Sequence, residues 1–373
     1  MPRPIRAVID IASMRHNLST VSQAIRDVDR HAKCWAVIKA NAYGHGIGAG
    51  VLAFEHADGL AMLDLEEAQQ VRRSGWTKPI LLLEGLFCAG DVQACEQLDL
   101  SLVIHCNEQI DWLSRARPTK PIDVYLKLDT GMHRLGMTPA DYDRAFVQLM
   151  ALRKQAIVGQ VTHMTHFACA DEPDGIDAAF TRFVAEAGSH PGAWCVANSA
   201  ASLIHAKRIV EMANGRPTWW RPGISLYGSS PLVTTTGETA CALGLKPTMT
   251  LRSELISVKT LRAGQGIGYG YRFRADRDMR VGVVACGYAD GYPRHAPTGT
   301  PVFVAGHRTR LIGRVSMDML TVDLSDMAQA QIGSDVVLWG REGPSVDDVA
   351  TAAGTIGYEL LTAVTARVPR VTE

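Results

Sequence analysis

The sequence predicts an α/β protein with an N-terminal (β/α)₈ TIM-type barrel followed by a mostly β C-terminal domain. Short, uninterrupted apolar runs recur from residue 34 to about residue 223, and segments with helical periodicity separate them. Such runs are typical of parallel strands that are buried on both faces and covered by helices. After residue 228 the apolar residues alternate with polar ones and glycine turns interrupt them, which indicates β-structure of a different kind.

Eight apolar runs are the expected barrel strands. They are CWAVIK (34–39), GLAMLD (59–64), PILLLE (79–84), LSLVIH (100–105), DVYLKLD (123–129), VGQVTHMTHF (158–167), AWCVAN (193–198) and TWWRPG (218–223). Residues 64–75, 107–117 and 138–155 are expected to be helices, and the last opens with Thr138 as N-cap and Pro139 in the first turn. Eight strand–helix repeats match a barrel of about 250 residues. A doubly wound open sheet is the alternative, because periodicity cannot show whether a sheet closes.

The connector between the two domains is the stretch 229–244, which is rich in Thr, Ser and Gly. We therefore assign residues 1–236 to the barrel and residues 237–373 to the C-terminal β-domain. A short helix is expected near residues 345–354, at the end of the second domain.

Composition excludes several classes of function. Lysine plus arginine (38) equal aspartate plus glutamate (38), so no overall charge attracts nucleic acid or an anionic membrane. The eight cysteines form no CxxC pair, so we expect no metal site and a reducing compartment. The N-terminus has no signal-peptide pattern, and no apolar stretch is long enough to span a bilayer. We expect a cytoplasmic protein.

Polar residues at the ends of the predicted strands are the candidate catalytic groups, because the active sites of parallel barrels lie there. They are Lys39 after the first run, Lys127, Asp129 and Arg134 after the fifth, His163 and His166 in the sixth, Asn198 and Ser199 after the seventh, and Arg221, Gly223 and Ile224 at the eighth. Asp64, Glu84 and His105 end the other three runs and have no assigned role.

This set suits pyridoxal 5′-phosphate, a cofactor with an aldehyde and a phosphate. A lysine at a buried strand end is partly desolvated, which lowers its pKa and favours imine formation with the aldehyde. The Ser199 hydroxyl and the Gly223 and Ile224 amides follow strands seven and eight, where barrels usually bind phosphate. Each feature also has an ordinary interpretation: Lys39 as a solvated rim cation, "NSA" as a simple helix N-cap, and Asp129 with Arg134 as a structural ion pair.

Taken together, the motifs resemble those of the alanine racemases, a bacterial family dependent on pyridoxal phosphate. The motifs are AVIKANAYGHG, KLDTGMHRLGM, THFACADE, ANSAA, RPGISLYG, LKPTMTL, GIGYGYRF, GYADGYPR, GRVSMDM and GYELLTAVTARVPR, in this order along essentially the whole chain. The resemblance implies a (β/α)₈ barrel followed by a β-domain, and a homodimer with shared active sites. It implies interconversion of L-alanine and D-alanine, which supplies D-alanine for peptidoglycan or allows its catabolism.

The resemblance also implies the roles of the reacting residues. Lys39 would act as the base for the D-enantiomer, and Tyr269 of GIGYGY, supplied by the partner subunit, as the base for the L-enantiomer. Arg134 would contact the cofactor's phenolic oxygen and the substrate carboxylate, and the Met317 backbone amide would hold that carboxylate too. Lys127 matches a lysine that is carbamylated in many family members and orients the neighbouring arginine.

The cofactor contacts implied by the resemblance form a second set. The residues are Lys39, Tyr43, His166, Ser199, Arg221, Gly223, Ile224 and Tyr358. Lys39 forms the imine, Arg221 donates to the pyridine nitrogen and His166 hydrogen-bonds to Arg221, while the others bind the phosphate. Because arginine cannot accept a proton, the ring nitrogen is expected to stay unprotonated.

Three other interpretations remain. A non-catalytic pyridoxal phosphate-binding protein would need neither Tyr269 nor the β-domain. A decarboxylase of the same fold would need a different acid beside the substrate. An amino-acid racemase of broader specificity would use every residue named, because the width of the pocket cannot be read from the sequence.

Overall fold

The computed structural model describes residues 3–232 and 234–373, which fold into two compact units. One unit comprises Asn17–Ala42 and Gly50–Leu226, and we call it the barrel unit. The other comprises Met1–His16, Tyr43–Ala49 and Tyr227–Glu373, and we call it the β unit. The division predicted between residues 236 and 237 remains a prediction.

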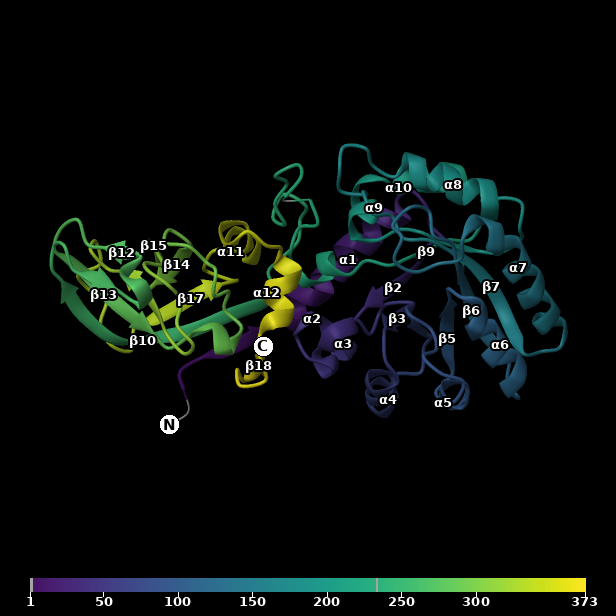
Figure 1. Ribbon diagram of the computed structural model, residues 1–373, viewed down its shortest axis with the longest axis horizontal. Helices are drawn as coiled ribbons and strands as arrows, with labels where there is room; N and C mark the ends of the chain where they lie inside the picture. Colours follow the sequence, from purple (N-terminus) through teal and green to yellow (C-terminus); the bar gives the residue numbers. More distant parts are fainter. Residues whose placement is uncertain (1–2, 233) are drawn as a thin grey trace. The chain divides into compact units, whose positions relative to one another are not determined.

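The barrel unit contains one strand in each of the eight predicted runs (Figure 1). They are β2 (Lys33–Val37), β3 (Gly59–Met62), β4 (Ile80–Leu82), β5 (Leu100–Ile104), β6 (Ile122–Lys127), β7 (Val158–Met164), β8 (Trp194–Cys195) and β9 (Trp219–Trp220). The strands are parallel and ordered β8-β7-β6-β5-β4-β3-β2-β9. A parallel bridge between Trp194 and Thr218 links the two end strands, so the sheet forms a nearly closed barrel. The barrel prediction is confirmed, and the open-sheet alternative is wrong.

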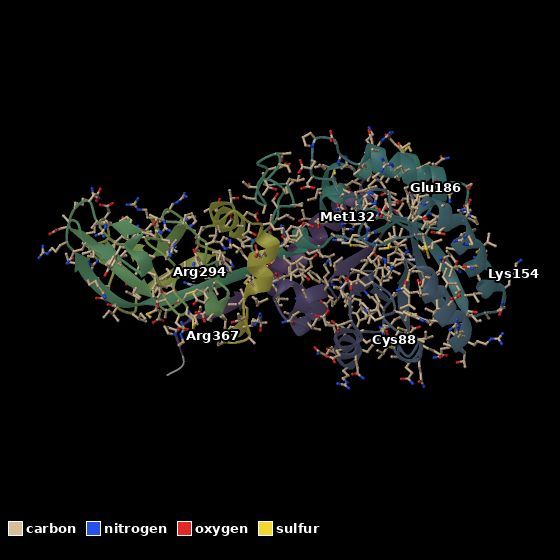
Figure 2. The ribbon with its side chains drawn as sticks, viewed as in Figure 1. Cys88, Met132, Lys154, Glu186, Arg294 and Arg367 are labelled. Atoms are coloured by element: carbon tan, nitrogen blue, oxygen red, sulfur yellow. The ribbon has the colours of Figure 1, made fainter. Side chains whose placement is uncertain are left out.

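Helices cover the outside of these strands (Figure 1). They are α4 (Leu65–Arg73), α5 (Asp91–Gln97), α6 (Asn107–Ala116), α7 (Pro139–Lys154), α8 (Asp177–Ala187), α9 (Ser199–Ile204) and α10 (Ala206–Ala213), while α1 (Ile11–Arg26), α2 (Lys39–Tyr43) and α3 (Ile47–Ala53) contain residues of both units. The predicted start of α7 is confirmed, since Thr138 Oγ1 accepts a hydrogen bond from Asp141 N at 3.3 Å and Pro139 is its first residue. Charged side chains such as Lys154 and Glu186 lie on these outer helices (Figure 2).

The barrel core depends on close packing between its first strands. Trp35 of β2 is buried and stacks on Trp219 at a centroid distance of 4.4 Å. Its register partner on β3 is Gly59, where an added Cβ would lie 2.1 Å from the Trp35 ring. Only glycine at this position leaves room for the indole. The packing therefore fixes the end of β2 that leads to Lys39.

The β unit is built on a mostly antiparallel sheet in the order β15-β14-β17-β10-β1-β18, with β13 pairing β10 and β16. The strands are β1 (Arg6–Ile9), β10 (Met249–Leu261), β13 (Met279–Val284), β14 (Pro301–Val304), β15 (His307–Arg310), β16 (Leu320–Asp323), β17 (Asp335–Trp339) and β18 (Arg370–Thr372), while β11 (Gly266–Ile267) and β12 (Phe273–Arg274) form a separate pair. Its helices are α11 (Val346–Ala353), which confirms the helix expected near 345–354, and α12 (Gly357–Ala363), with the 3₁₀ turns η2 (Tyr269–Tyr271) and η3 (Tyr288–Asp290). A further 3₁₀ turn, η1 (Ile224–Tyr227), contains residues of both units. The mostly β character of the second domain is confirmed.

The N-terminal strand β1 belongs to this sheet, where it pairs antiparallel with β10. It lies in the segment 1–236 that we assigned to the barrel domain. A run of four residues contains no information about which sheet it will join, so this pairing was not predictable. Over residues 3–232 and 234–373, no helix is both long and apolar enough to cross a membrane.

Candidate active site

Lys39 directly follows the first barrel strand, as predicted. The backbone at the end of β2 is held on both sides, because Ile38 N donates to Ala61 O at 2.8 Å and Val37 N donates to Pro222 O at 3.2 Å. Burial lowers the pKa of the half-buried Lys39 ammonium, the Arg134 guanidinium lowers it further, and the Glu84 carboxylate opposes both. A lowered pKa leaves more of the amine neutral, which is what a nucleophile or proton acceptor needs.

The chain after Lys39 forms a left-handed turn. Ala40, Asn41, Ala42 and Tyr43 have φ values of 54°, 55°, 52° and 49°. Each left-handed residue other than glycine costs roughly 1–2 kcal/mol, so the surrounding structure must hold this turn. The turn fixes the direction of the chain directly beside Lys39.

Lys127 lies at the end of β6 with only 7% of its surface exposed. Burial, Arg221 and Arg134 lower the pKa of Lys127 to about 8, against the opposing charges of Asp129 and Glu84. A buried amine that is partly neutral near this pH has the reactivity required for carbamylation.

His166 shares this environment. Burial lowers the pKa of His166 well below its ordinary value, and the charges of Arg221, Lys127, Arg134 and Lys39 lower it further. The imidazole is therefore neutral at physiological pH. These mutual effects place five predicted residues from the ends of four strands within electrostatic reach of one another, at the carboxyl end of the barrel.

The loop that carries Arg134 is closed by its own backbone. Met137 N donates to Lys127 O at 2.7 Å, and Asp129 Oδ1 accepts from Gly131 N at 2.9 Å and from His133 N at 3.1 Å. Within the described residues, the Asp129 carboxylate lies 3.4 Å from His133 Nδ1 and forms no ion pair with Arg134, so the structural Asp129–Arg134 pair considered above is wrong. Arg134 is exposed.

The predicted phosphate contacts lie together at the ends of β8 and β9. Ser199 Oγ accepts a hydrogen bond from Gly223 N at 2.8 Å and one from Ser225 Oγ at 3.3 Å, and Ser199 is buried. Ile224 follows Gly223 at the start of η1. Asn198 is the N-cap of α9, with its side chain accepting from Ala201 N at 3.0 Å. Hydroxyls and backbone amides thus gather here, and such donors suit an anion.

Arg221 is buried and held entirely by neutral acceptors. Its guanidinium donates to Thr165 O at 2.7 Å, to Val196 O at 3.4 Å, to the Cys195 carbonyl and to Cys195 Sγ at 3.0 Å. Within the described part of the chain, His166 is not among its hydrogen-bond acceptors, and the two interact through charge. No carboxylate of the described residues bonds this guanidinium, so no counter-charge offsets it there.

The remaining predicted residues belong to the β unit. Tyr43 is buried and stacks on Tyr227 at a centroid distance of 4.5 Å, and its ring lies 6.2 Å from that of Tyr358. Tyr269 and Met317 lie on turns of this unit with 67% and 53% of their surfaces exposed. The barrel unit, by contrast, contains the other predicted site residues, which are Lys39, Lys127, Arg134, His166, Ser199, Arg221, Gly223 and Ile224.

One histidine was wrongly placed on the rim. His163 of β7 is buried against α7, where its Nδ1 accepts a hydrogen bond from Tyr142 Oη at 2.6 Å and its Nε2 donates to Pro191 O at 3.2 Å. Successive residues of a strand point to opposite faces, so the side chains of His163 and Met164, the last residue of β7, lie on opposite sides of the sheet. Burial lowers the pKa of His163 to about 4, and its role is structural.

Two residues of the site region were not found from the sequence. The Glu84 carboxylate raises the pKa of both Lys39 and Lys127, although we had given it no role. The buried Gln109 of α6 fixes the loops after β4 and β5: its Nε2 donates to Glu84 O and Leu86 O at 3.0 Å, and its Oε1 accepts from His105 N at 2.9 Å. A polar residue on the buried face of α6 was the signal that could have identified it.

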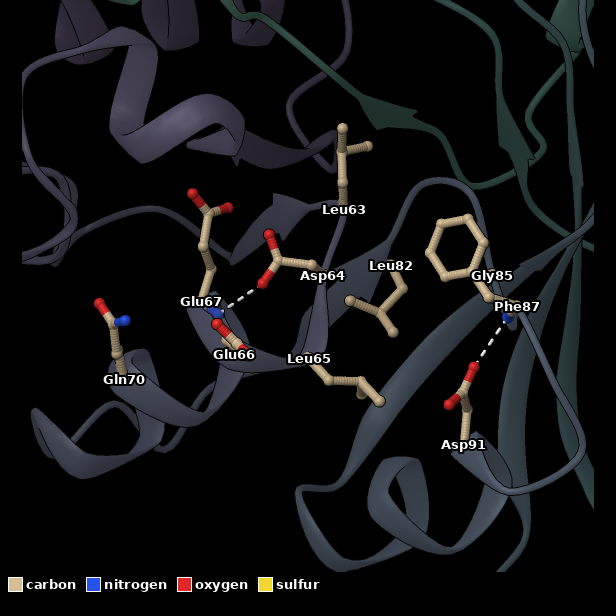
Figure 3. Close-up of a pocket in the computed structure, with 10 residues that line it drawn as sticks. All are labelled: Leu63, Asp64, Leu65, Glu66, Glu67, Gln70, Leu82, Gly85, Phe87 and Asp91. Carbon is tan, nitrogen blue, oxygen red and sulfur yellow. Dashed lines mark hydrogen bonds between the residues drawn. The ribbon is translucent and has the colours of Figure 1, made fainter. Parts of the chain in front are cut away.

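A pocket of about 430 Å³ lies at the loops that follow β3 and β4 (Figure 3). Its lining combines apolar and acidic residues: Leu63, Asp64, Leu65, Glu66, Glu67, Gln70, Leu82, Gly85, Phe87 and Asp91. None of these is a predicted site residue. Glu67, however, is bonded to the turn that follows Lys39, as described below.

Comparison with known proteins gives consistent results for both halves of the chain. The family described as "Alanine racemase, N-terminal domain" matches residues 9–231, and "Alanine racemase, C-terminal domain" matches residues 248–372. The chain belongs to the alanine racemase family. The alanine racemases of Bordetella petrii and Bordetella avium are each 52% identical to it, over 99% of this chain and 99% of theirs.

Solved structures of the family have the same fold over their whole length. The biosynthetic alanine racemase of Pseudomonas aeruginosa is 45% identical with a TM-score of 0.91, covering 100% of this chain and 99% of that one. The alanine racemase of Acinetobacter baumannii is 32% identical with a TM-score of 0.88, covering 100% of both chains. The predicted family is confirmed, and the chain is an isomerase of this family.

Proposed function

We propose that this protein interconverts L-alanine and D-alanine with pyridoxal 5′-phosphate as its cofactor. The observation that supports this best is the presence, in one barrel unit, of Lys39, a strand-end lysine with a lowered pKa, and Arg221, a buried arginine whose hydrogen-bond acceptors among the described residues include no carboxylate. Membership of the alanine racemase family over the full chain supplies the substrate.

The donor set of the barrel unit fits this cofactor. The Ser199 hydroxyl and the Gly223 and Ile224 amides would hold the phosphate, and the family resemblance adds Tyr43 and Tyr358. All of these groups are hydroxyls or backbone amides, which can donate to the phosphate and carry no negative charge that would repel it. Lys39 Nζ would bind the aldehyde carbon, and Arg221, accompanied by His166, would face the pyridine nitrogen. When bound, the cofactor supplies an aldehyde for the substrate amine and a conjugated ring that accepts the electron pair left by the α-proton.

Lys39 and Tyr269 would move the proton. The neutral Lys39 amine, favoured by burial and by Arg134, takes the α-proton of the D-enantiomer from one face, and the Tyr269 hydroxyl returns one on the other face. In the opposite direction the two residues exchange roles. Two groups on opposite faces allow inversion at the α-carbon without either group crossing to the other face.

Tyr269 would serve the active site of a second subunit. Its phenol is 67% exposed and Met317, the proposed amide donor to the substrate carboxylate, is 53% exposed. Large apolar side chains that are exposed together are typical of an interface. We therefore propose a homodimer with two shared active sites.

Arg221, Arg134 and Lys127 would control the charge around the substrate. A guanidinium cannot accept a proton, so Arg221 keeps the pyridine nitrogen unprotonated and limits the electron-withdrawing power of the ring. This favours rapid return of the proton to carbon over transamination. Arg134 would bind the substrate carboxylate, and a carbamylated Lys127 would orient Arg134.

The test is loss of optical rotation from L-alanine by the purified protein with pyridoxal phosphate, compared with Lys39→Ala. The expected results are racemisation by the wild-type protein, and loss of both the reaction and the visible band of lysine-bound cofactor in the variant. A panel of other L-amino acids measures specificity. An inactive wild-type protein that binds the cofactor, or an active Lys39→Ala variant, would contradict the proposal.

A further inference from the structure

The left-handed turn of residues 40–43 needs an external support. A left-handed conformation is unfavourable for residues with a Cβ, and here it extends over four consecutive residues that are not glycine. Asparagine tolerates it better than alanine does, so Asn41 is the most permissive member. The turn persists only if contacts made by its backbone and its small side chains stabilise it.

Backbone hydrogen bonds hold the part of this turn that lies in the barrel unit. Ala42 N donates to Ile38 O at 2.8 Å, which closes the turn on the end of β2. Asn41 N donates to Glu67 Oε1 at 2.7 Å, which connects the turn to α4. The second bond is the shorter, and its acceptor is a carboxylate, so it belongs to the stronger class of hydrogen bonds in proteins.

Packing fixes the other side of the turn. Ala42 is fully buried, and a Cβ added to Gly50 would lie 2.9 Å from the Ala42 Cβ and 3.4 Å from Ile38 Cγ2. The absence of a side chain at Gly50 therefore lets Ala42 pack closely on this side of the turn. Asn41 itself is exposed, and its amide is restrained by the bond to Glu67.

Glu67 is itself firmly placed. Its backbone N donates to Asp64 Oδ1 at 2.7 Å, the N-cap bond of α4 (Figure 3). The carboxylate thus lies in the first turn of a helix, where the helix dipole favours a negative charge. Ala68 and Val71 are buried and anchor α4 to the barrel.

The Glu67 carboxylate has no other function visible in its contacts. Its Oε2 is buried and has no hydrogen-bond partner among the described residues. Burial raises the pKa of Glu67, and the bond from Asn41 opposes that rise. A carboxylate that is half removed from water, with one backbone amide as its partner, is placed to hold that amide. The adjacent Glu66 is exposed and forms no such contact.

We propose that Glu67 is a positioning residue for Lys39: its carboxylate holds the left-handed turn through the Asn41 amide and so fixes the direction in which the Lys39 side chain leaves β2. The inference rests on the proposed function of Lys39. Glu67 touches neither cofactor nor substrate in this account. It acts through two residues of backbone.

Three substitutions and one control separate the effects. Glu67→Ala removes the acceptor, Glu67→Asp keeps the charge but shortens the side chain beyond reach of Asn41, and Glu67→Gln keeps the acceptor without the charge. Glu66→Ala is the matched control in the same helical turn. Of the two variants that remove the contact, Glu67→Asp makes the smaller change to the folded protein, so it tests the proposal even if Glu67→Ala does not fold.

The first measurement is hydrogen exchange of the Asn41 amide in the cofactor-loaded protein, by mass spectrometry with residue-level fragmentation. Loss of a charge-assisted hydrogen bond predicts roughly 10- to 100-fold faster exchange in Glu67→Ala and Glu67→Asp. Glu66→Ala should stay within about twofold of the wild-type rate, and Glu67→Gln, which keeps the acceptor but loses its charge, should exchange only about fivefold faster. Wild-type exchange in Glu67→Asp would overturn the proposal.

The second measurement is alanine racemisation. Glu67→Ala and Glu67→Asp should lower kcat about tenfold or more with little change in KM, because a misdirected amine affects the proton transfer and not substrate binding. Recovery of kcat in Glu67→Gln is expected, and an equal loss in Glu67→Gln would overturn the hydrogen-bond account. Failure of the proposed function can be told apart from failure of the Glu67 proposal. An active Lys39→Ala variant would refute the proposed function, whatever the exchange rate of the Asn41 amide.

Discussion

Replacement of Lys127 by methionine should stabilise this protein while damaging its activity. Lys127 is a buried ammonium placed near Arg221 and Arg134, and these charges and burial together lower its pKa from 10.5 to about 8. Methionine has a similar length and no charge, so it fills the same space without the electrostatic penalty.

The size of the effect follows from the pKa of Lys127. A pKa lowered from 10.5 to about 8 corresponds to about 3 kcal/mol, at about 1.4 kcal/mol for each pKa unit. The unfolded chain binds the proton more tightly than the folded chain does. Below pH 8 both states are protonated and the folded state is destabilised in full; between pH 8 and 10.5 the folded state loses its proton first and the penalty declines.

The assay is urea unfolding of wild-type protein and Lys127→Met in carbonate-free buffer at several pH values. The variant should be more stable by about 3 kcal/mol at pH 7, and the difference should vanish as the pH approaches 10.5. The control is Lys154→Met on the outer surface of α7, expected to change stability by less than about 0.5 kcal/mol. Equal stability of wild type and Lys127→Met at pH 7, or a difference independent of pH, would refute the reasoning.

Two further substitutions test the proposed chemistry. Arg221→Glu provides a proton acceptor for the pyridine nitrogen and should raise the transamination side reaction, measured as pyruvate formed from alanine; unchanged pyruvate would argue against the role of Arg221. Mixing Lys39→Ala with Tyr269→Ala subunits should restore about a quarter of wild-type activity, since half of randomly mixed dimers contain one intact site. Persistent inactivity after verified subunit exchange would count against a shared site.

Much of the barrel was predictable because its physical signals are local. A strand buried on both faces, such as the run ending at Lys39, needs consecutive apolar residues, and the N-cap at Thr138 depends on residues within one helical turn. The location of Lys39 at a strand end followed from the same pattern. The family motifs extended the prediction to residues such as Tyr269, which no periodicity identifies.

The unpredicted features depend on contacts between distant residues. Hydrophobic periodicity contains no information on the handedness of a turn, so the left-handed conformation at Asn41 was missed. Its acceptor Glu67 is 26 residues further along the chain and resembles any exposed glutamate of a helix. His163 was misplaced because a strand end defines a position along the barrel axis, whereas the inward or outward direction of each side chain depends on local register.

The central claim is that Lys39 and Tyr269 transfer protons on opposite faces of the substrate. The most direct measurement is exchange of the α-hydrogen in deuterated water by Tyr269→Phe, followed by NMR separately for D-alanine and L-alanine. The account predicts that the variant exchanges the α-hydrogen of D-alanine through Lys39, does not exchange that of L-alanine, and no longer racemises either. Racemisation at the wild-type rate, or exchange from L-alanine alone, would contradict it.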